Sequence, residues 1–137
     1  VADRVAFPGV LSHREVADLL QRGRAFVQHS VRAPDGDSEG NPVAVREAMA
    51  SGLPVVATRH AGIPETVSHE QTGLLVDELA WREMASHMGR LLDDPSLAAR
   101  LGRAGRERAE REFGMSRYVD RLGDLLETAA EGAPPRS

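Results

Sequence analysis

Residues 42–58 read PVAVREAMASGLPVVAT, and this stretch indicates the fold class of the chain. Pro42 stands where a helix accepts proline, in its first turn, and the residues behind it predict a helix that runs to Gly52. Residues 54–58 then form an uncharged, largely apolar run, which is typical of a strand covered on both faces of a parallel sheet. The stretch therefore predicts a helix followed by a buried strand, the repeating unit of an α/β fold.

The same alternation continues on both sides of this stretch. Towards the N-terminus, Ser12 and Glu15 form a capping box for a helix that ends near Gly23. Apolar positions at helical spacing predict further helices over about residues 79–92 and 97–113 and after Ser116. Short apolar runs predict additional strands at residues 5–7, 25–27 and 73–76. Four strands that alternate with helices indicate an α/β protein with a Rossmann-like parallel sheet and flanking helices, of the doubly wound type.

The domain boundaries follow from length and composition. We expect residues 1–131 to form one domain and residues 132–137, GAPPRS, to be a disordered tail. A Rossmann-like half-sheet usually begins with a glycine-rich turn after its first strand, and none is found here. We therefore expect the chain to be a fragment that is truncated at its N-terminus.

Composition excludes several classes of function. The chain has no cysteine, so disulfides and thiolate metal sites are excluded. A net charge of −4 argues against a general nucleic-acid binder, which would be basic. All 17 basic residues are arginine, so a lysine for phosphate binding would have to come from outside this sequence. With no apolar run near the length of a membrane span, we expect a cytoplasmic protein that contacts a membrane only through a part outside this chain.

Two glutamates flank the point where a polar loop meets the helix. Glu39 precedes the helix and Glu47 lies eight positions later, a little over a turn inside it. The amides of Val43 and Ala44 fall in the first turn, where they lack intrahelical partners and can bind a phosphate or pyrophosphate. Gly40 removes a side chain where a ligand would approach the backbone. Carboxylates beside a phosphate site make sense if they accept hydrogen bonds from sugar hydroxyls on either side of it.

Residue chemistry alone leaves a simpler interpretation open. In that interpretation residues 32–41 are a solvated loop, and Glu47 is a helix glutamate that balances the charge of Arg46.

Residues 37–58 resemble the C-terminal domain of GT-B retaining glycosyltransferases of family 4. The resemblance rests on an E-x7-E signature, from Glu39 to Glu47, followed by EAMASGLPVVAT. It continues through residues 62–65, GIPE, and 73–76, GLLV, and extends over about residues 5–127. Residues 35–40, DGDSEG, and 60–65, HAGIPE, are most similar to the branch that builds bacterial exopolysaccharides such as colanic acid.

The resemblance implies a role for each motif residue. Glu39 would be the catalytic residue that holds hydroxyls of the donor sugar, and Glu47 would take the ribose hydroxyls of the nucleotide. The remaining donor-site residues would be Gly40 and Asn41 on the loop, Val43 and Ala44 with diphosphate-binding amides, and the backbone of Val10 and Leu11 beside the base. No metal and no cofactor would be needed, since the helix N-terminus does the work of a cation.

The implied function is that of a transferase of the hexosyltransferase type. Residues 1–131 would be its nucleotide-sugar-binding domain. The intact enzyme would move a sugar from a nucleotide diphosphate sugar to a hydroxyl acceptor in polysaccharide or glycoconjugate biosynthesis. Its partners would be the donor and an N-terminal acceptor domain of the same enzyme, and the fragment alone would be inactive.

Departures from the family pattern keep alternatives open. The family's Arg/Lys pair on the diphosphate lies upstream of the first strand and is absent here, and His29-Ser30 replaces a common Pro-Ser dipeptide. Asp35-Gly36-Asp37 spells the D-x-D of metal-dependent transferases, although it is also ordinary loop chemistry. The histidines show no ligand spacing, and only His29 and His60, at strand ends, could line a cleft. The rival functions are a non-catalytic nucleotide-sugar-binding module and a GT-B epimerase.

Overall fold

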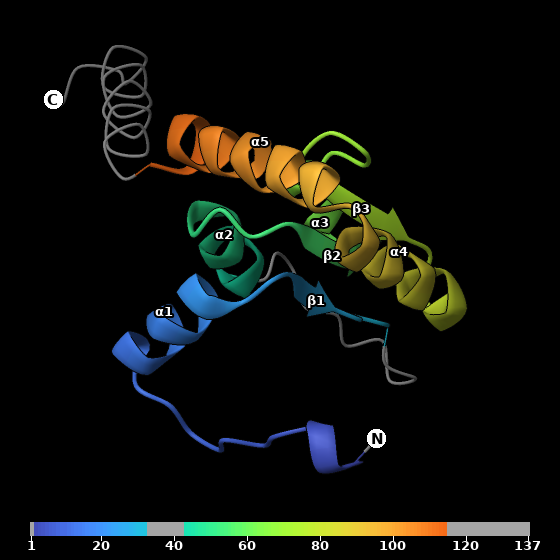
Figure 1. The fold of residues 1–137 in the computed structure, drawn as a ribbon. Helices are drawn as coiled ribbons and strands as arrows, with labels where there is room; N and C mark the ends of the chain where they lie inside the picture. The colour runs from blue at the N-terminus through green and yellow to red at the C-terminus, as the bar shows by residue number, and fades with distance from the viewer. Residues whose placement is uncertain (1, 33–42, 115–137) are drawn as a thin grey trace, which may run out of the picture.

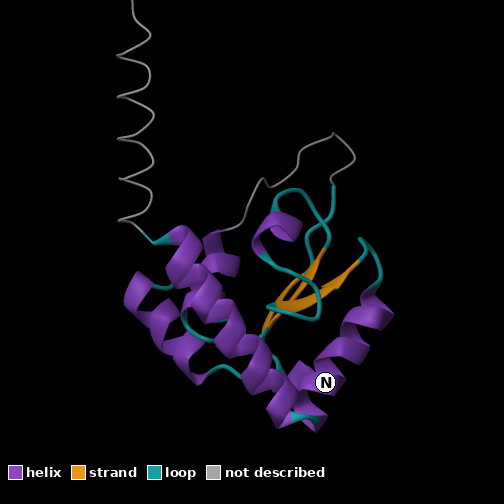
Figure 2. Ribbon diagram, turned by 90° about the horizontal axis from the view of Figure 1, so that it is seen from above, coloured by secondary structure: helices purple, strands orange, loops and turns teal. Residues whose placement is uncertain are grey.

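The computed structural model describes residues 2–32 and 43–114. Three parallel strands form a sheet in the order β1 (Phe26–Gln28), β2 (Val55–Thr58) and β3 (Gly73–Val76) (Figure 1). Figure 2 shows helices on either side of these strands. The expected α/β fold class with a parallel sheet and flanking helices is confirmed.

The described residues contain six helical segments: η1 (Ala2–Arg4), α1 (His13–Arg22), α2 (Val43–Ala50), α3 (Ile63–Thr66), α4 (Trp81–Asp93) and α5 (Pro95–Phe113). The predicted capping box of α1 is confirmed, because Ser12 caps the helix and Glu15 reaches back to the Ser12 amide at 2.8 Å. The end of α2 is also as expected. Gly52 has a φ of +77°, and the next amide, that of Leu53, bonds back to the carbonyl of Ala48 at 3.0 Å.

The core divides into two clusters because side chains alternate along the strands. Val55, Ala57 and Leu75 point to the face covered by α2, where they pack with Met49 and Ile63. The intervening residues Val56, Leu74 and Val76 point to the other face, where Met84 and Leu91 of α4 cover them. The central strand β2 is buried over its whole length, which is why its sequence carries no charge.

Helix α5 closes the amino ends of the strands. A Cβ added at Gly102 would lie 2.1 Å from the carbonyl oxygen of Gly52, and one at Gly105 would lie 3.2 Å from that of Thr72. Gly52 lies shortly before β2, and Thr72 lies directly before β3. The backbone of α5 therefore packs directly against the amino ends of these two strands. The opposite edge, formed by the carboxyl ends of the strands, has no such helix across it among the described residues.

The predicted strand at residues 5–7 is wrong. The segment belongs to no helix or strand, and Val5 and Phe7 are 50% and 91% exposed. A strand forms only where its N–H and C=O groups meet a partner, and none of the described strands lies beside it. The described sheet therefore has three strands rather than four. The predicted helix after Ser116, the boundary at residue 131 and the tail at 132–137 lie outside the described residues.

Candidate functional site: the carboxyl edge of the sheet

The topology gathers the candidate site at the carboxyl edge of the sheet, where open α/β sheets bind ligands. Helix α2 begins after the carboxyl end of β1 and runs back towards the amino edge, so its N-terminus lies at the carboxyl edge. Helix α1 leads into the amino end of β1, so its N-terminus lies at the same edge. The N-termini of α1 and α2, far apart in sequence, therefore lie at the same edge of the sheet.

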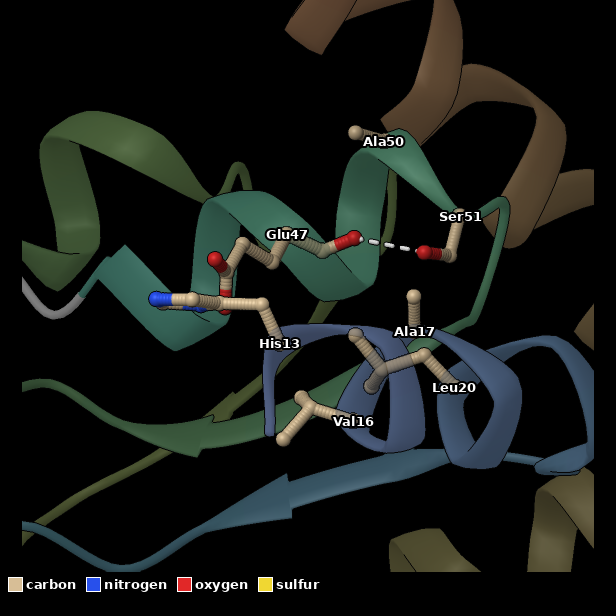
Figure 3. Close-up of a pocket in the computed structure, with 7 residues that line it drawn as sticks. All are labelled: His13, Val16, Ala17, Leu20, Glu47, Ala50 and Ser51. Atoms are coloured by element: carbon tan, nitrogen blue, oxygen red, sulfur yellow. Dashed lines mark hydrogen bonds between the residues drawn. The ribbon is translucent and has the colours of Figure 1, made fainter. Parts of the chain in front are cut away.

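A pocket of about 270 Å³ lies between these two helices. Figure 3 shows Glu47 of α2 and His13 of α1 at one end of it, near the two N-termini, and Leu20 and Ser51 at the other. The side chains between them are small or apolar: Val16, Ala17 and Ala50. The pocket thus combines an apolar floor with a carboxylate and an imidazole at its outer end.

The surroundings of Glu47 argue against the simpler interpretation of this residue. Its side chain is exposed, and no ion pair joins it to Arg46 in the described part of the chain. The Arg46 guanidinium lies over the ring of Phe113, 5.5 Å from the centroid, where it contributes a cation–π contact. Glu47 therefore does not serve as the counter-ion of Arg46.

The other predicted donor-site residues are only partly represented. Val43 is 63% exposed and Ala44 is also exposed, both in the first turn of α2. Val10 is fully exposed and Leu11 half-buried, directly before Ser12, which caps α1. These residues lie on the two helix starts that border the pocket. Glu39, Gly40 and Asn41 lie outside the described residues.

Side-chain hydrogen bonds join the three strand ends at this edge. Thr58, the last residue of β2, accepts from the Ser30 amide at 3.0 Å and donates to the Ser30 carbonyl at 2.7 Å. Glu78, two residues after β3, accepts from the Arg32 amide at 3.0 Å and lies 2.7 Å from Nδ1 of His60. The hydrogen bond with His60, followed by that from Arg32, holds the pKa of Glu78 below its usual value. The carboxylate is therefore ionised at neutral pH.

Two residues at this edge were not singled out from the sequence. His13 lines the pocket, although its position in a helix start marks it only as a surface residue. Glu78 could have been found, because the carboxyl ends of parallel strands meet at one edge and it follows the third strand. Of the two histidines expected at the cleft, His60 is 3% exposed and bonded to Glu78, whereas His29 is exposed.

The described residues contain neither a candidate metal site nor a candidate membrane-spanning helix. Within residues 2–32 and 43–114, no group of His, Asp or Glu side chains is arranged to hold a metal ion. Asp35 and Asp37, the D-x-D alternative, lie outside those ranges. No described helix combines the length and the apolar composition needed to cross a membrane.

Comparison with known sequences identifies the family. The model of the family "glycosyl transferases group 1" matches residues 1–108. WcaL of Escherichia coli, whose name places it among colanic acid biosynthesis glycosyltransferases, is 41% identical over 127 residues, which are 91% of this chain and 31% of the relative. A GDP-mannose-dependent α-(1-6)-phosphatidylinositol monomannoside mannosyltransferase of Mycobacterium tuberculosis is 33% identical over 132 residues, covering 92% of this chain and 33% of the relative. The chain thus spans about a third of the length of these relatives.

Solved structures agree with this result. Sucrose-phosphate synthase from Thermosynechococcus elongatus is similar with a TM-score of 0.81 and 31% identity, over 96% of this chain and 31% of the other. HepE of Anabaena in complex with UDP-glucose is similar with a TM-score of 0.79 and 25% identity, over 92% and 33% of the two chains. The family match and these structures confirm the resemblance to GT-B glycosyltransferases that the motif at residues 37–58 indicated. The chain therefore belongs to the glycosyl transferases group 1 family.

Proposed function

We propose that this chain is the donor-binding part of a retaining glycosyltransferase. The intact enzyme takes a sugar from a nucleotide diphosphate sugar and transfers it to a hydroxyl acceptor, in polysaccharide or glycoconjugate biosynthesis. Residues 1–131 form its nucleotide-sugar-binding domain, and the acceptor is held by an N-terminal domain of the same enzyme. The enzyme works in the cytoplasm, and any membrane contact is made through that other domain.

The observation that carries the proposal is the placement of Glu47. Its carboxylate is exposed, is not paired with Arg46, and stands at the mouth of the pocket between α1 and α2. A carboxylate accepts two hydrogen bonds side by side, as the neighbouring hydroxyls of a ribose require. The apolar side chains of Val16 and Leu20, which line the pocket away from its mouth, offer a surface for a flat ring. This combination suits a nucleoside better than it suits a solvated helix face.

The start of α2 supplies the chemistry for the diphosphate. The amides of Val43 and Ala44 are in the first turn, where a helix offers N–H groups and a positive dipole end to an anion. As the glycosidic bond breaks, negative charge grows on the leaving diphosphate, and these fixed donors stabilise it most in the transition state. Glu39 holds hydroxyls of the sugar, which becomes oxocarbenium-like. No metal is required in this scheme.

The relatives support a nucleotide-sugar donor. HepE was solved with UDP-glucose, and the mycobacterial relative is named as GDP-mannose-dependent. Since both ligands share a ribose and a diphosphate, the part of the site built by Glu47 and α2 suits either. The base and the sugar are selected by other contacts.

A titration series tests the proposal. UDP-glucose, GDP-mannose and ADP-glucose are added in turn to the 137-residue chain in a calorimeter, with inorganic phosphate as the control anion. We expect one nucleotide sugar to bind in the millimolar range, roughly −4 kcal/mol, and phosphate alone to bind more weakly. Failure of all three nucleotide sugars to bind would contradict the proposal. An intact enzyme that binds the donor but transfers no sugar would support the non-catalytic module instead.

A further inference from the structure

Glu78 makes contacts with two segments that are distant in sequence. One oxygen accepts from the Arg32 amide at 3.0 Å, and the other lies 2.7 Å from Nδ1 of His60. Because an ionised carboxylate only accepts hydrogen bonds, the His60 Nδ1 carries the proton. The His60 ring is 3% exposed, whereas the Glu78 side chain is 37% exposed. A single surface carboxylate thus fixes a buried imidazole and a backbone amide together.

These contacts join the segments that follow all three strands of the sheet. Arg32 follows β1, His60 follows β2 and Glu78 follows β3, so the carboxylate joins the three segments that leave the carboxyl edge. Beneath it, Thr58 holds the β1 and β2 segments together through Ser30. His60 also sets the start of α3, since its carbonyl accepts from the Ile63 amide at 3.0 Å. Two groups of hydrogen bonds, one around Thr58 and one around Glu78, therefore hold together the edge that borders the candidate donor site.

We propose that Glu78 is a positioning residue for the donor site, whose carboxylate ties the segments after β1, β2 and β3 into the geometry that donor binding requires. The inference rests on the proposed function, because it concerns the same edge of the sheet. Glu78 does not touch the donor. It acts through Arg32, the last described residue before α2, and through His60, which leads into α3.

The chemistry of the network indicates which substitution breaks it with least disturbance. Both groups that Glu78 binds are N–H donors, so both of its oxygens must accept. In Glu78→Gln one acceptor becomes an NH2 group that faces another donor, and one of the two contacts is lost at nearly constant volume. His60→Asn keeps an N–H group close to the position of Nδ1, whereas His60→Leu offers none.

The test measures the Kd of the 137-residue chain for its preferred nucleotide sugar, together with its melting temperature. Asp77→Asn is the local control, because Asp77 is the neighbouring residue, is 84% exposed and pairs only across 3.6 Å with Arg59 among the contacts described. Glu70→Gln is the stability control, because it breaks the 2.9 Å ion pair of Glu70 with Arg90 of α4. Glu70 precedes β3, so this ion pair lies at the amino edge of the sheet, opposite the donor site.

We expect Glu78→Gln to raise Kd about tenfold, equivalent to about 1.4 kcal/mol, and both controls to leave it within about twofold. His60→Leu should weaken binding as Glu78→Gln does, and His60→Asn should restore most of the affinity. If Glu78→Gln fails to fold, the comparison of His60→Leu with His60→Asn still tests the positioning role of Glu78. Wild-type Kd in Glu78→Gln, or an equal loss in Glu70→Gln at the same melting temperature, would overturn the positioning role alone. If the wild-type chain binds no nucleotide sugar, the proposed function fails, and this inference fails with it.

Discussion

At the scale of single residues, the donor-site assignment depends most on Glu47. Many helix glutamates are exposed without having a function, and exposure alone would say nothing. Glu47 differs in two ways. The guanidinium of the neighbouring Arg46 lies over the Phe113 ring instead of pairing with Glu47, and His13 and the apolar side of α1 form a pocket beside Glu47. The residue therefore keeps an available carboxylate at a place where a ligand fits.

Replacing Glu47 should reduce nucleotide affinity regardless of the sugar. A hydrogen bond to a charged group contributes about 1.5–3 kcal/mol, so Glu47→Ala should weaken nucleotide diphosphate and nucleotide sugar by tenfold or more, and about equally. Calorimetry with both ligands measures the effect. Glu107→Ala is the control, since Glu107 is an exposed helix glutamate of α5 that does not line the pocket between α1 and α2. A loss confined to the nucleotide sugar would contradict the ribose role of Glu47.

Glu39 should show the opposite pattern. Its proposed partner is the sugar, so Glu39→Ala should leave nucleotide diphosphate binding nearly intact and lower kcat in the intact enzyme. Kinetics of the intact enzyme, combined with calorimetry on the chain, separate the two effects. Loss of nucleotide diphosphate binding in Glu39→Ala, with none in Glu47→Ala, would mean that the two roles are assigned wrongly.

At the scale of secondary-structure elements, α5 is the helix that covers the amino ends of the strands. It packs against the amino ends of the strands through glycines, because its backbone lies too close there for a side chain. Leu101 and Ala109 of the same helix enter the two core clusters, one on each face of the sheet. The helix therefore links both halves of the core.

Gly102→Ala should be strongly destabilising. The new Cβ would lie 2.1 Å from the Gly52 carbonyl oxygen, which is backbone and can move only with the end of α2. We expect a loss of roughly 3 kcal/mol or more in the free energy of unfolding, measured by urea denaturation. Gly89→Ala in α4 is the matched control, because no atom lies within 4 Å of its Cβ position and alanine favours a helix by up to about 1 kcal/mol. Equal stability of the two variants would contradict the close packing of α5.

The elements that could be predicted from sequence are those with local determinants. Two of these determinants are the capping box at Ser12 and Glu15 and the left-handed glycine after α2. Each acts within a few residues, so the start of α1 and the end of α2 are predicted correctly. Residues 5–7 have the composition of a strand, but pairing needs a distant partner that composition does not specify. In the candidate site, the motif predicts a role for Glu47, whereas the contact between Glu78 and His60 joins residues 18 positions apart and depends on the order of the strands.

At the scale of the whole molecule, one buried histidine should make the stability of the fold depend on pH near neutrality. His87 of α4 is 8% exposed, with Arg90 Nη1 at 3.4 Å, Glu83 at 3.7 Å and the His69 ring at 5.9 Å. Burial, followed by the charge of Arg90, lowers the pKa of His87 below its ordinary value of 6.5. The unfolded chain then binds a proton at a higher pH than the folded chain does.

The sign of the effect follows directly from this shift. The contribution of His87 is complete above pH 6.5 and is lost as the pH falls through the lowered folded-state pKa. Urea denaturation between pH 7.5 and 5 should show stability falling by at most about 1.4 kcal/mol per pH unit for this single group. His87→Leu should abolish that slope. Glu70, whose pKa is lowered by Arg90, adds a separate loss only below its ordinary value of 4.5. A slope that persists in His87→Leu would show that another group is responsible.

The most direct test of the donor site is to locate bound nucleotide sugar on the chain without a metal present. Amide chemical shifts of the 137-residue chain are recorded while UDP-glucose or GDP-mannose is added in excess EDTA, and sugar transfer is assayed in parallel. We predict millimolar binding, no transfer, and the largest shifts at Val43, Ala44 and Glu47 and at Val10 and Leu11 before α1. Shifts that appear only after manganese is added, or that centre away from the starts of α1 and α2, would contradict the account.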